Sequence, residues 1–260
     1  MGRARSLFPP PAGAPNSDAV NWFRKVPHAP HKRAITLHIR RFSPGAEPYW
    51  QAYAVPVTPK MSVLDALFDV LEQQDPTLSF RYSCRAQMCG SCAMRVNGRE
   101  TLACGRRLEE LEDAVTVEPL RNLPVMKDLV VDMAPFFAGY GAVDPAFAGA
   151  TGAEPAVIPP ASGLRAAVDE HLGCISCGAC YSACPIVALN ANFAGPAALN
   201  RVYTLVADVR DQAAERRLAL ASGADGVFSC RCVGNCVEVC PVNIAPMFAI
   251  QRLRRRAIRQ

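Results

Sequence analysis

The sequence predicts an α+β protein, with a sheet-forming N-terminal domain followed by an all-α domain. From residue 34 onward, apolar and polar residues alternate as they do in strands. After residue 163, apolar residues recur at helical spacing instead. The two patterns are separated by residues 141–163, which are almost all Ala, Gly and Pro and therefore indicate a linker. A chain of 260 residues is long enough for two modest cores.

We expect four segments along the chain. These are a flexible extension (1–33), a sheet domain (34–140), a linker (141–163) and a helical domain (164–260). The extension has six prolines, six basic residues and one acid, Asp18, without the hydrophobic stretch of a secretory signal. An organelle presequence or a docking arm remains an alternative for this segment.

The sheet domain is expected to open with a hairpin. Alternation through Ile35, Leu37 and Ile39 predicts its first strand, and the β-prone run 53–57 follows a turn near Pro44. Ser62 is then the expected N-cap of a helix with Asp65 in its first turn. The inward stripe of this helix is Val63, Leu64, Leu67, Phe68 and Leu71.

A second hairpin follows a cysteine-containing loop. Its strands are 93–96 and 100–103, and they are joined by Asn97-Gly98, a pair that favours a type I′ turn. Residues 115–118 add a short strand. Two hairpins and a crossing helix around such a loop describe a β-grasp domain.

Helices are expected in five further places. One spans Met126–Gly139, with Leu129, Val130, Met133 and Phe137 facing inward. The others belong to the C-terminal domain and span Leu164–His171, Pro196–Val209, Asp211–Ala221 and Pro246–Ile258.

Eleven of the twelve cysteines fall into three runs whose spacings are typical of iron-sulfur ligands. The first run is Cys84, Cys89, Cys92 and Cys104, which has the plant-type C-x4-C-x2-C…C spacing of a [2Fe–2S] cluster. Gly90 lies in this loop, where a small residue lets backbone N–H groups approach the sulfurs.

The other two runs are predicted to exchange ligands. The second is Cys174, Cys177, Cys180 and Cys184 followed by Pro185, the bacterial ferredoxin run in which the fourth cysteine serves a different cluster. The third run repeats this skeleton with Cys230, Cys236 and Cys240 before Pro241. The crossing assigns Cys174, Cys177, Cys180 and Cys240 to a [4Fe–4S] cluster. It leaves Cys184, Cys230 and Cys236 for a cluster with three thiolates, for which [3Fe–4S] is the expected form.

Cys232 is predicted not to bind iron. Val233 occupies the position of the missing cysteine, and Cys232 is one residue out of frame. A rearranged loop in which Cys232 supplies a fourth thiolate to a second [4Fe–4S] cluster remains the alternative. The full fold prediction is therefore a β-grasp [2Fe–2S] ferredoxin domain followed by an all-α two-cluster ferredoxin domain.

Other uses of the cysteines fit the pattern less well. Disulfides would need the higher cysteine density of a small secreted scaffold. Structural zinc sites usually pair two short C-x2-C knuckles, which differ from C-x2-C-x2-C-x3-C-P. A Rieske site has no ligands, because the four histidines lie outside the runs. They are His28, His31, His38 and His171.

The charge pattern excludes no partner by itself. The net charge is +5, and the stretch 251–259 is strongly basic. Such a stretch suits nucleic acid, but also a helix C-terminus, anionic lipid or a protein partner, and we expect no nucleic acid. The most apolar candidate span, 129–143, is broken by Asp132, Pro135 and glycines, so no transmembrane helix is expected.

No catalytic residue is predicted on this chain. It has no Ser-His-Asp arrangement, no phosphate loop and no G-x-G-x-x-G for a flavin. We expect it to conduct electrons between two chemistries performed elsewhere.

Several motifs resemble the iron-sulfur subunit of succinate dehydrogenase and fumarate reductase, over about residues 34–256. They are Arg81-Tyr82-Ser83-Cys84-Arg85, Cys89-Gly90-Ser91-Cys92, Asn122-Leu123-Pro124-Val125, Lys127–Asp132, Cys174–Pro185, Gly195-Pro196-Ala197-Ala198, Asp208-Val209-Arg210-Asp211 and Cys236–Pro241. Ile186, Val187, Ala188 and Arg231 stand where many succinate-ubiquinone members have tryptophan and histidine, so here the chain looks more like the fumarate-reductase branch, whose members often use menaquinone.

This resemblance implies a peripheral subunit of an oxidoreductase. Its partners would be an FAD flavoprotein that interconverts succinate and fumarate, and membrane-anchor subunits that bind quinone on the cytoplasmic face of the membrane. The order would be [2Fe–2S] nearest FAD, then [4Fe–4S], then [3Fe–4S] nearest quinone. An iron-sulfur subunit of another flavoenzyme, heterodisulfide-reductase-like or glycerol-phosphate oxidising, and a zinc-stabilised interaction protein are the alternatives.

Overall fold

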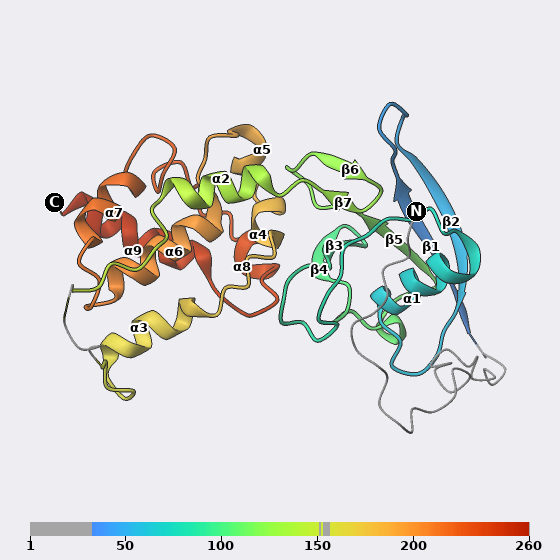
Figure 1. Ribbon diagram of the computed structural model, residues 1–260, viewed down its shortest axis with the longest axis horizontal. Coiled ribbons are helices and arrows are strands. Elements are labelled where there is room, and N and C mark those ends of the chain that lie inside the picture. The colour runs from blue at the N-terminus through green and yellow to red at the C-terminus, as the bar shows by residue number, and fades with distance from the viewer. Residues whose placement is uncertain (1–32, 151, 153–156, 260) are drawn as a thin grey trace, which may run out of the picture. The chain divides into compact units, whose positions relative to one another are not determined.

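The computed structural model describes residues 33–150, 152 and 157–259. This part of the chain forms one compact unit from Arg33 onward. The expected N-terminal extension lies outside the described residues, apart from Arg33. Figure 1 shows the strands in the blue-to-green part of the chain and most helices in the yellow-to-red part.

A five-stranded mixed sheet organises the N-terminal region. Its strands in sequence order are β1 (Ala34–Arg41), β2 (Tyr49–Pro56), β3 (Ala93–Val96), β4 (Arg99–Leu102) and β5 (Ala114–Glu118). The order in the sheet is β2-β1-β5-β3-β4, with β1 and β5 parallel and the other neighbours antiparallel. This is the β-grasp arrangement expected from the sequence.

Local sequence explains both hairpins. In β1, Ile35, Leu37 and Ile39 are buried and alternate with half-buried residues, so one face of the strand forms the core. Asn97 and Gly98 have φ of 48° and 76°, the positive values that a type I′ turn requires. Both predicted hairpins and the fifth strand are confirmed.

The crossing helix α1 (Val63–Asp69) begins where the sequence indicates. The Ser62 side chain accepts a hydrogen bond from the Asp65 N–H, and the Asp65 carboxylate accepts one from the Ser62 N–H, which completes a capping box. The helix continues as a short π-helical turn (Val70–Gln74), and a 3-10 turn (Leu108–Glu110) precedes β5.

The single helix expected over Met126–Gly139 is wrong. A two-stranded hairpin, β6 (Val125–Lys127) and β7 (Val130–Val131), occupies its first half, and α2 (Ala134–Ala142) begins only afterwards. Asp128 is held at φ 45° by buried hydrogen bonds, which prevents a continuous helix. Phe136 rather than Phe137 faces the core of α2, since Phe137 is 52% exposed.

The C-terminal region is helical. Its elements are α3 (Gly163–Leu172), α4 (Ala179–Ser182), α5 (Pro185–Leu189), α6 (Gly195–Ala207), α7 (Ala214–Ala221), α8 (Asn235–Glu238) and α9 (Pro246–Ile258). The four predicted helices correspond to α3, α6, α7 and α9 and are confirmed, whereas the short α4, α5 and α8 were not predicted.

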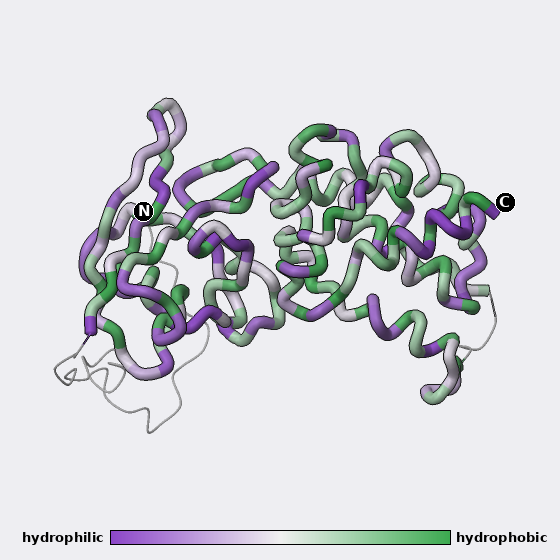
Figure 2. The backbone as a smooth tube through the Cα atoms, turned by 180° about the vertical axis from the view of Figure 1, so that it is seen from behind, coloured by the Kyte–Doolittle hydropathy of each residue, from purple (hydrophilic) through white to green (hydrophobic). Residues whose placement is uncertain are grey.

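Helix α6 is the centre of this region. All of its residues except Arg201 are buried, and it packs against α2, α3, α4, α7 and α9. One hydrophobic core joins both regions, running from Ile35 in the sheet to Leu253 in α9. The C-terminal end of α9 is hydrophilic, as the purple stretch beside the C-terminus in Figure 2 shows. None of the helices in the described part of the chain is long and apolar enough to cross a membrane.

Candidate iron-sulfur sites

The first site is the cysteine loop between the π-helical turn and β3, together with the chain after β4. Cys84 is exposed and Cys89 half-buried, whereas Cys92 and Cys104 are buried. The Ala103 N–H donates to the Cys92 carbonyl at 3.1 Å, which brings the last two cysteines together across β3 and β4. A hydrogen bond with the Ser91 side chain lowers the pKa of the Cys89 thiol to about 6.

The loop backbone is shaped to surround sulfur. Arg85, Gln87 and Gly90 have φ of 55°, 59° and 74°. The N–H groups of Ala86 and Met88 both point at Cys84 Sγ, each at 3.4 Å. Nearby backbone N–H groups that point at one atom in this way favour negative charge there, as the N–H groups around Fe–S clusters do.

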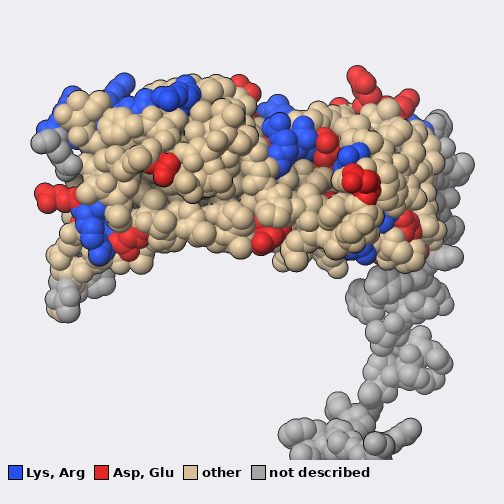
Figure 3. Space-filling view, turned by 90° about the horizontal axis from the view of Figure 1, so that it is seen from above, with Lys and Arg blue, Asp and Glu red and all other residues tan. Residues whose placement is uncertain are grey.

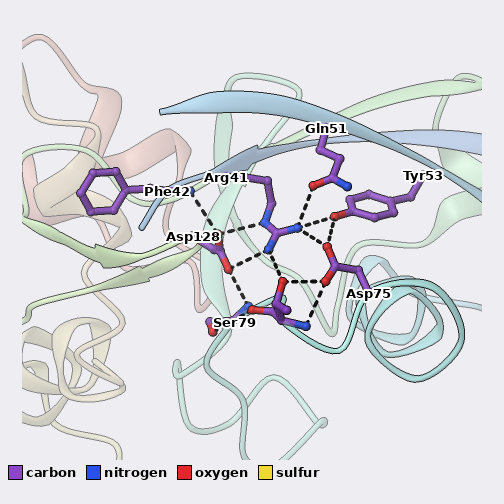
Figure 4. Close-up of polar contacts among 8 residues, drawn as sticks. Arg41, Phe42, Gln51, Tyr53, Asp75, Ser79 and Asp128 are labelled. Atoms are coloured by element: carbon purple, nitrogen blue, oxygen red, sulfur yellow. Dashed lines mark hydrogen bonds and ion pairs between the residues drawn. The ribbon is translucent and has the colours of Figure 1, made fainter. Parts of the chain in front are cut away.

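A buried charge network, drawn in Figure 4, anchors the segment leading into this loop. Arg41 at the end of β1 donates to Asp128 at 2.9 Å and also binds Asp75 and Tyr53. Asp128 accepts the Ser79 N–H at 2.9 Å, five residues before Cys84. The network therefore ties the chain that enters the first site to the sheet and to the β6-β7 hairpin.

The second site is a cavity lined by the four thiols that the crossing assigned to one cluster. Its cysteines are Cys174, Cys177, Cys180 and Cys240. The Ile244 N–H points at Cys240 Sγ at 3.3 Å. Burial raises the pKa of the Cys177 thiol to about 11 and holds that of Cys180 well above its usual value. Burial disfavours a free thiolate at these positions, but a thiol that coordinates a metal is deprotonated outright. These buried sulfurs are therefore better suited to bind a metal than to ionise alone.

The third site is a cavity lined by the three thiols left by the crossing, and also by Cys232 and Val233. The three are Cys184, Cys230 and Cys236. The Cys232 N–H donates to Cys230 Sγ at 3.4 Å. The Cys232 side chain contacts Arg254 on α9, with 3.9 Å between Sγ and Nη1, and a hydrogen bond with Gln251 lowers its pKa. Neither Gln251 nor Arg254 lines the cavity.

The second and third runs repeat the same backbone. Gly178 and Gly234, with φ of 81° and 98°, each precede a four-residue helix, α4 and α8. Two residues before each glycine the chain again has positive φ, 51° at Ser176 and 55° at Cys232. Cys232 therefore corresponds to Ser176, and Val233 corresponds to Cys177. The helices α4 and α8 pack together, and Asn235 Nδ2 donates to the Ala183 carbonyl at 3.1 Å.

The first and second sites touch. A Cβ added to Gly90 would lie 2.7 Å from Cys177 Cβ and 2.9 Å from Cys177 Cα, so only glycine permits this approach. Glu100 of β4 accepts the Ser182 hydroxyl at 2.9 Å, and Arg99 donates to the Glu238 carbonyl at 2.6 Å. These contacts join β4 of the sheet region to α4 and α8 of the helical region.

Sequence reasoning missed the residues that hold this junction. Asn122 Nδ2 is within 3.2 Å of the carbonyl oxygens of Tyr181, Ser182 and Cys184. Its only signal in the sequence is its place in the Asn-Leu-Pro motif. Nothing local predicts that Glu100, in the middle of a strand, binds Ser182.

The residues fit iron-sulfur clusters by the chemistry of their donors. The thiols of the second and third sites line cavities, and those of the first lie in a loop whose N–H groups point at sulfur. Thiolates are the usual ligands of iron-sulfur clusters. Among the described residues, no group of three or more Cys, His, Asp or Glu is placed to hold a single metal ion. Fold and thiols together define a two-domain iron-sulfur protein.

Comparison with known proteins gives the same class. A 2Fe-2S iron-sulfur cluster binding domain family matches residues 36–138, and a 4Fe-4S dicluster domain family matches residues 170–244. The fumarate reductase iron-sulfur subunit of Escherichia coli O157:H7 is 38% identical over 84% of this chain and 91% of its own. That of Mycobacterium tuberculosis is 40% identical over 86% and 92%.

One further relative covers nearly the whole chain, and one solved structure covers most of it. The succinate dehydrogenase iron-sulfur subunit of Paracoccus denitrificans is 32% identical over 98% of this chain and 94% of its own. A chain of the Mycobacterium smegmatis Sdh1 complex in the apo form superposes with a TM-score of 0.80 at 28% identity, over 87% of this chain and 96% of that one. The protein belongs to the family of iron-sulfur subunits of succinate dehydrogenase and fumarate reductase.

Proposed function

We propose that this chain is the electron-conducting subunit of a succinate:quinone oxidoreductase or quinol:fumarate reductase. Electrons pass between the FAD of a partner flavoprotein and a membrane quinone. The observation that carries the proposal is the contact at Gly90, which brings the first and second cysteine sites together within one chain. Short steps between redox centres are what a conduit requires.

Each site is assigned one cluster. Cys84, Cys89, Cys92 and Cys104 hold [2Fe–2S]; Cys174, Cys177, Cys180 and Cys240 hold [4Fe–4S]; Cys184, Cys230 and Cys236 hold [3Fe–4S]. The order along the conduit is the first site nearest the flavin, then the second, then the third nearest quinone. The shared cavities at the second and third sites support these ligand sets.

The proposed partners are a flavoprotein and one or more membrane-anchor subunits, on the cytoplasmic face of the membrane. Exposed Tyr82 and Met88 around the first site offer a surface for the flavoprotein. Exposed Phe228 and Val233 beside the third site offer a surface for the anchor. Lys and Arg side chains gather at the end that carries α7 and α9 (Figure 3), which suits anionic headgroups.

The test is purification of the chain with and without its flavoprotein. With the flavoprotein present, succinate should reduce the clusters, as followed by absorbance and electron paramagnetic resonance (EPR). The chain alone should carry the clusters but give no succinate or fumarate turnover. Turnover by the chain alone would refute the conduit, and a colourless protein that contains zinc would refute the iron-sulfur assignment.

A further inference from the structure

His171, near the end of α3, is a buried histidine for which the cysteine sites have no evident use. It is 2% exposed. Its ring lies edge-on against Tyr203 of α6, with 4.9 Å between ring centres. It precedes Cys174 by three residues, and none of its polar contacts is a cysteine.

The hydrogen bonds of Asn200 on α6 assign the tautomer of this histidine. Asn200 Nδ2 donates to the His171 carbonyl at 3.0 Å, so its Oδ1 must be the atom that faces the ring. That oxygen lies 2.7 Å from His171 Nδ1 and can only accept. Nδ1 therefore carries the proton, and Nε2 holds the free lone pair of the neutral ring.

Two charged groups face the Nε2 side of the ring. Arg252 Nη1, on α9, lies 3.5 Å from Nε2, and Glu170 Oε2 lies 3.7 Å from it. Arg252 also binds Glu170 at 2.9 Å and the Tyr203 hydroxyl at 3.1 Å. The Glu170 side chain is 58% exposed, so it connects Nε2 to solvent. With Asn200 on the other side, these are the polar and charged groups that the structure places around the ring.

On the Nδ1 side of the ring, Asn200 connects His171 to the second cysteine site. Asn200 lines the cavity that holds Cys174, Cys177, Cys180 and Cys240. The arrangement thus runs from solvent through Glu170, His171 and Asn200 to the wall of this cavity. A change of charge in the cavity acts on the imidazole through one intervening side chain, in surroundings of low dielectric.

We propose that His171 Nε2 is a proton-binding site coupled to reduction of the cluster at the second cysteine site. One electron arriving at that site is accompanied by one proton taken from solvent at Nε2, and both leave on reoxidation. The protonated Nε2 forms an ion pair with Glu170 Oε2, 3.7 Å away. The inference rests on the proposed function, which supplies the electron.

The direction of the pH dependence follows from the charges around the ring. Burial, together with the positive charge of Arg252, lowers the pKa of His171 from its usual 6.5, while Asn200 and Glu170 oppose this shift. An added negative charge in the cavity favours the imidazolium and raises the pKa. Between the lower pKa of the oxidised state and the higher pKa of the reduced state, the reduced state holds more protons. In that window the reduction potential falls as pH rises.

The test is an EPR-monitored redox titration of the second site in the full chain at several pH values between 5 and 8. In the wild type, the equilibrium constant for reduction should fall with pH by up to tenfold per unit, which is about 59 mV for one electron. In His171→Gln, which can still donate to Asn200 but does not titrate, the dependence should vanish. His38→Gln, on β1, is the matched control and should retain it.

A second variant covers the case in which His171→Gln does not fold. Glu170→Gln removes an exposed carboxylate that favours the imidazolium, so the pH window should move to lower pH with its slope retained. A flat wild-type titration, or an unchanged slope in His171→Gln, overturns the inference and leaves the proposed function intact. Absence of any reducible cluster at the second site overturns the proposed function itself.

Discussion

The first cysteine site and the crossed pair of sites are built in opposite ways. The first takes all its proposed ligands from one stretch, Cys84–Cys104, where the positive φ values and the N–H groups of the loop position the sulfurs. The second and third each combine proposed ligands from two distant runs, which meet where α4 and α8 pack against each other. A local site depends on turn chemistry, whereas a crossed site depends on tertiary packing.

The same contrast appears in the environment of the sulfurs. The first site is mixed: Cys84 is exposed and a hydrogen bond with Ser91 lowers the pKa of Cys89, whereas burial raises the pKa of Cys92 to about 12. In the helical region, burial raises the pKa of Cys177 to about 11 and of Cys236 to about 12. Metal binding at buried thiols must displace protons, so it is coupled to folding of the surrounding helices.

The largest expected effect is the loss of clusters in Cys240→Ser, and Cys84→Ser is the variant with which it is compared. Loss of Cys240 removes the proposed ligand that the chain just after α8 brings to the second site, so both crossed clusters and the packing of α4 on α8 should suffer. Loss of Cys84 should affect the first cluster alone. EPR of each cluster and iron content measure this. An unaltered third-site signal and normal stability in Cys240→Ser would contradict the contrast between local and crossed sites.

Among the described residues, each region also has one buried arginine in an ion network. Arg41 binds Asp75 and Asp128 in the sheet region; Arg217, 0% exposed, binds Asp211 in the helical region and also donates to the Asp144 carbonyl at 2.8 Å. Removing one partner of a buried pair leaves uncompensated charge, which costs about 3–5 kcal/mol. We expect Arg41→Met and Arg217→Met to lose about this much free energy of unfolding in urea.

The control for both is Arg33→Ala, which removes an ion pair with Asp113 whose side chains are 37% and 77% exposed. It should cost less than about 1 kcal/mol. If Arg41→Met changes stability no more than this control, the network is not what anchors the segment before Cys84. Separate unfolding transitions of the two regions would show which one each arginine holds.

Gly90→Ala tests the contact between the two kinds of site. Alanine at positive φ costs about 1–2 kcal/mol, and its Cβ would overlap Cys177 at 2.7 Å. The first and second clusters should move apart, which weakens their magnetic coupling and slows electron transfer between them. Gly98 has a similar φ, 76°, and a Cβ added there would meet no atom closer than 3.8 Å. Gly98→Ala should therefore lose only the stability that the backbone strain costs. Equal behaviour of the two variants in EPR and rapid-mixing reduction would mean that the contact at Gly90 does not set the spacing.

Features that depend on neighbouring residues were predictable, and those that depend on distant ones were not. The Ser62 cap, the Asn97-Gly98 turn and the spacing of each cysteine run are local patterns, and the structure has the cap and the turn as predicted. The hairpin at 125–131 was missed because Arg41, far away in sequence, holds Asp128 in a conformation that no helix allows. The approach of Gly90 to Cys177 has no local signature at all. The proposed ligand sets themselves came from a spacing rule, and the structure places their members around shared cavities.

The smallest expected effect is that of Cys232→Ser, which should leave the third cluster unchanged. The crossed runs repeat each other in backbone, and Cys232, at φ 55°, stands where Ser176, at φ 51°, stands in the site with four cysteines. Ser176 is not one of those four. The position equivalent to the ligand Cys177 is Val233, which is 58% exposed and cannot bind iron.

The contacts of the Cys232 side chain also indicate that it is not a ligand. Gln251 and Arg254 belong to α9 and do not line the cavity, so the sulfur has contacts outside the site, although Cys232 is itself one of the residues that line the cavity. A [3Fe–4S] cluster is paramagnetic when oxidised, and an ordinary low-potential [4Fe–4S] cluster is not. The oxidised wild type should therefore show the [3Fe–4S] signal, and Cys232→Ser should show it with equal intensity. A wild type without the signal, together with its appearance in Cys232→Ser, would mean that the loop rearranges and that Cys232 is the fourth ligand after all.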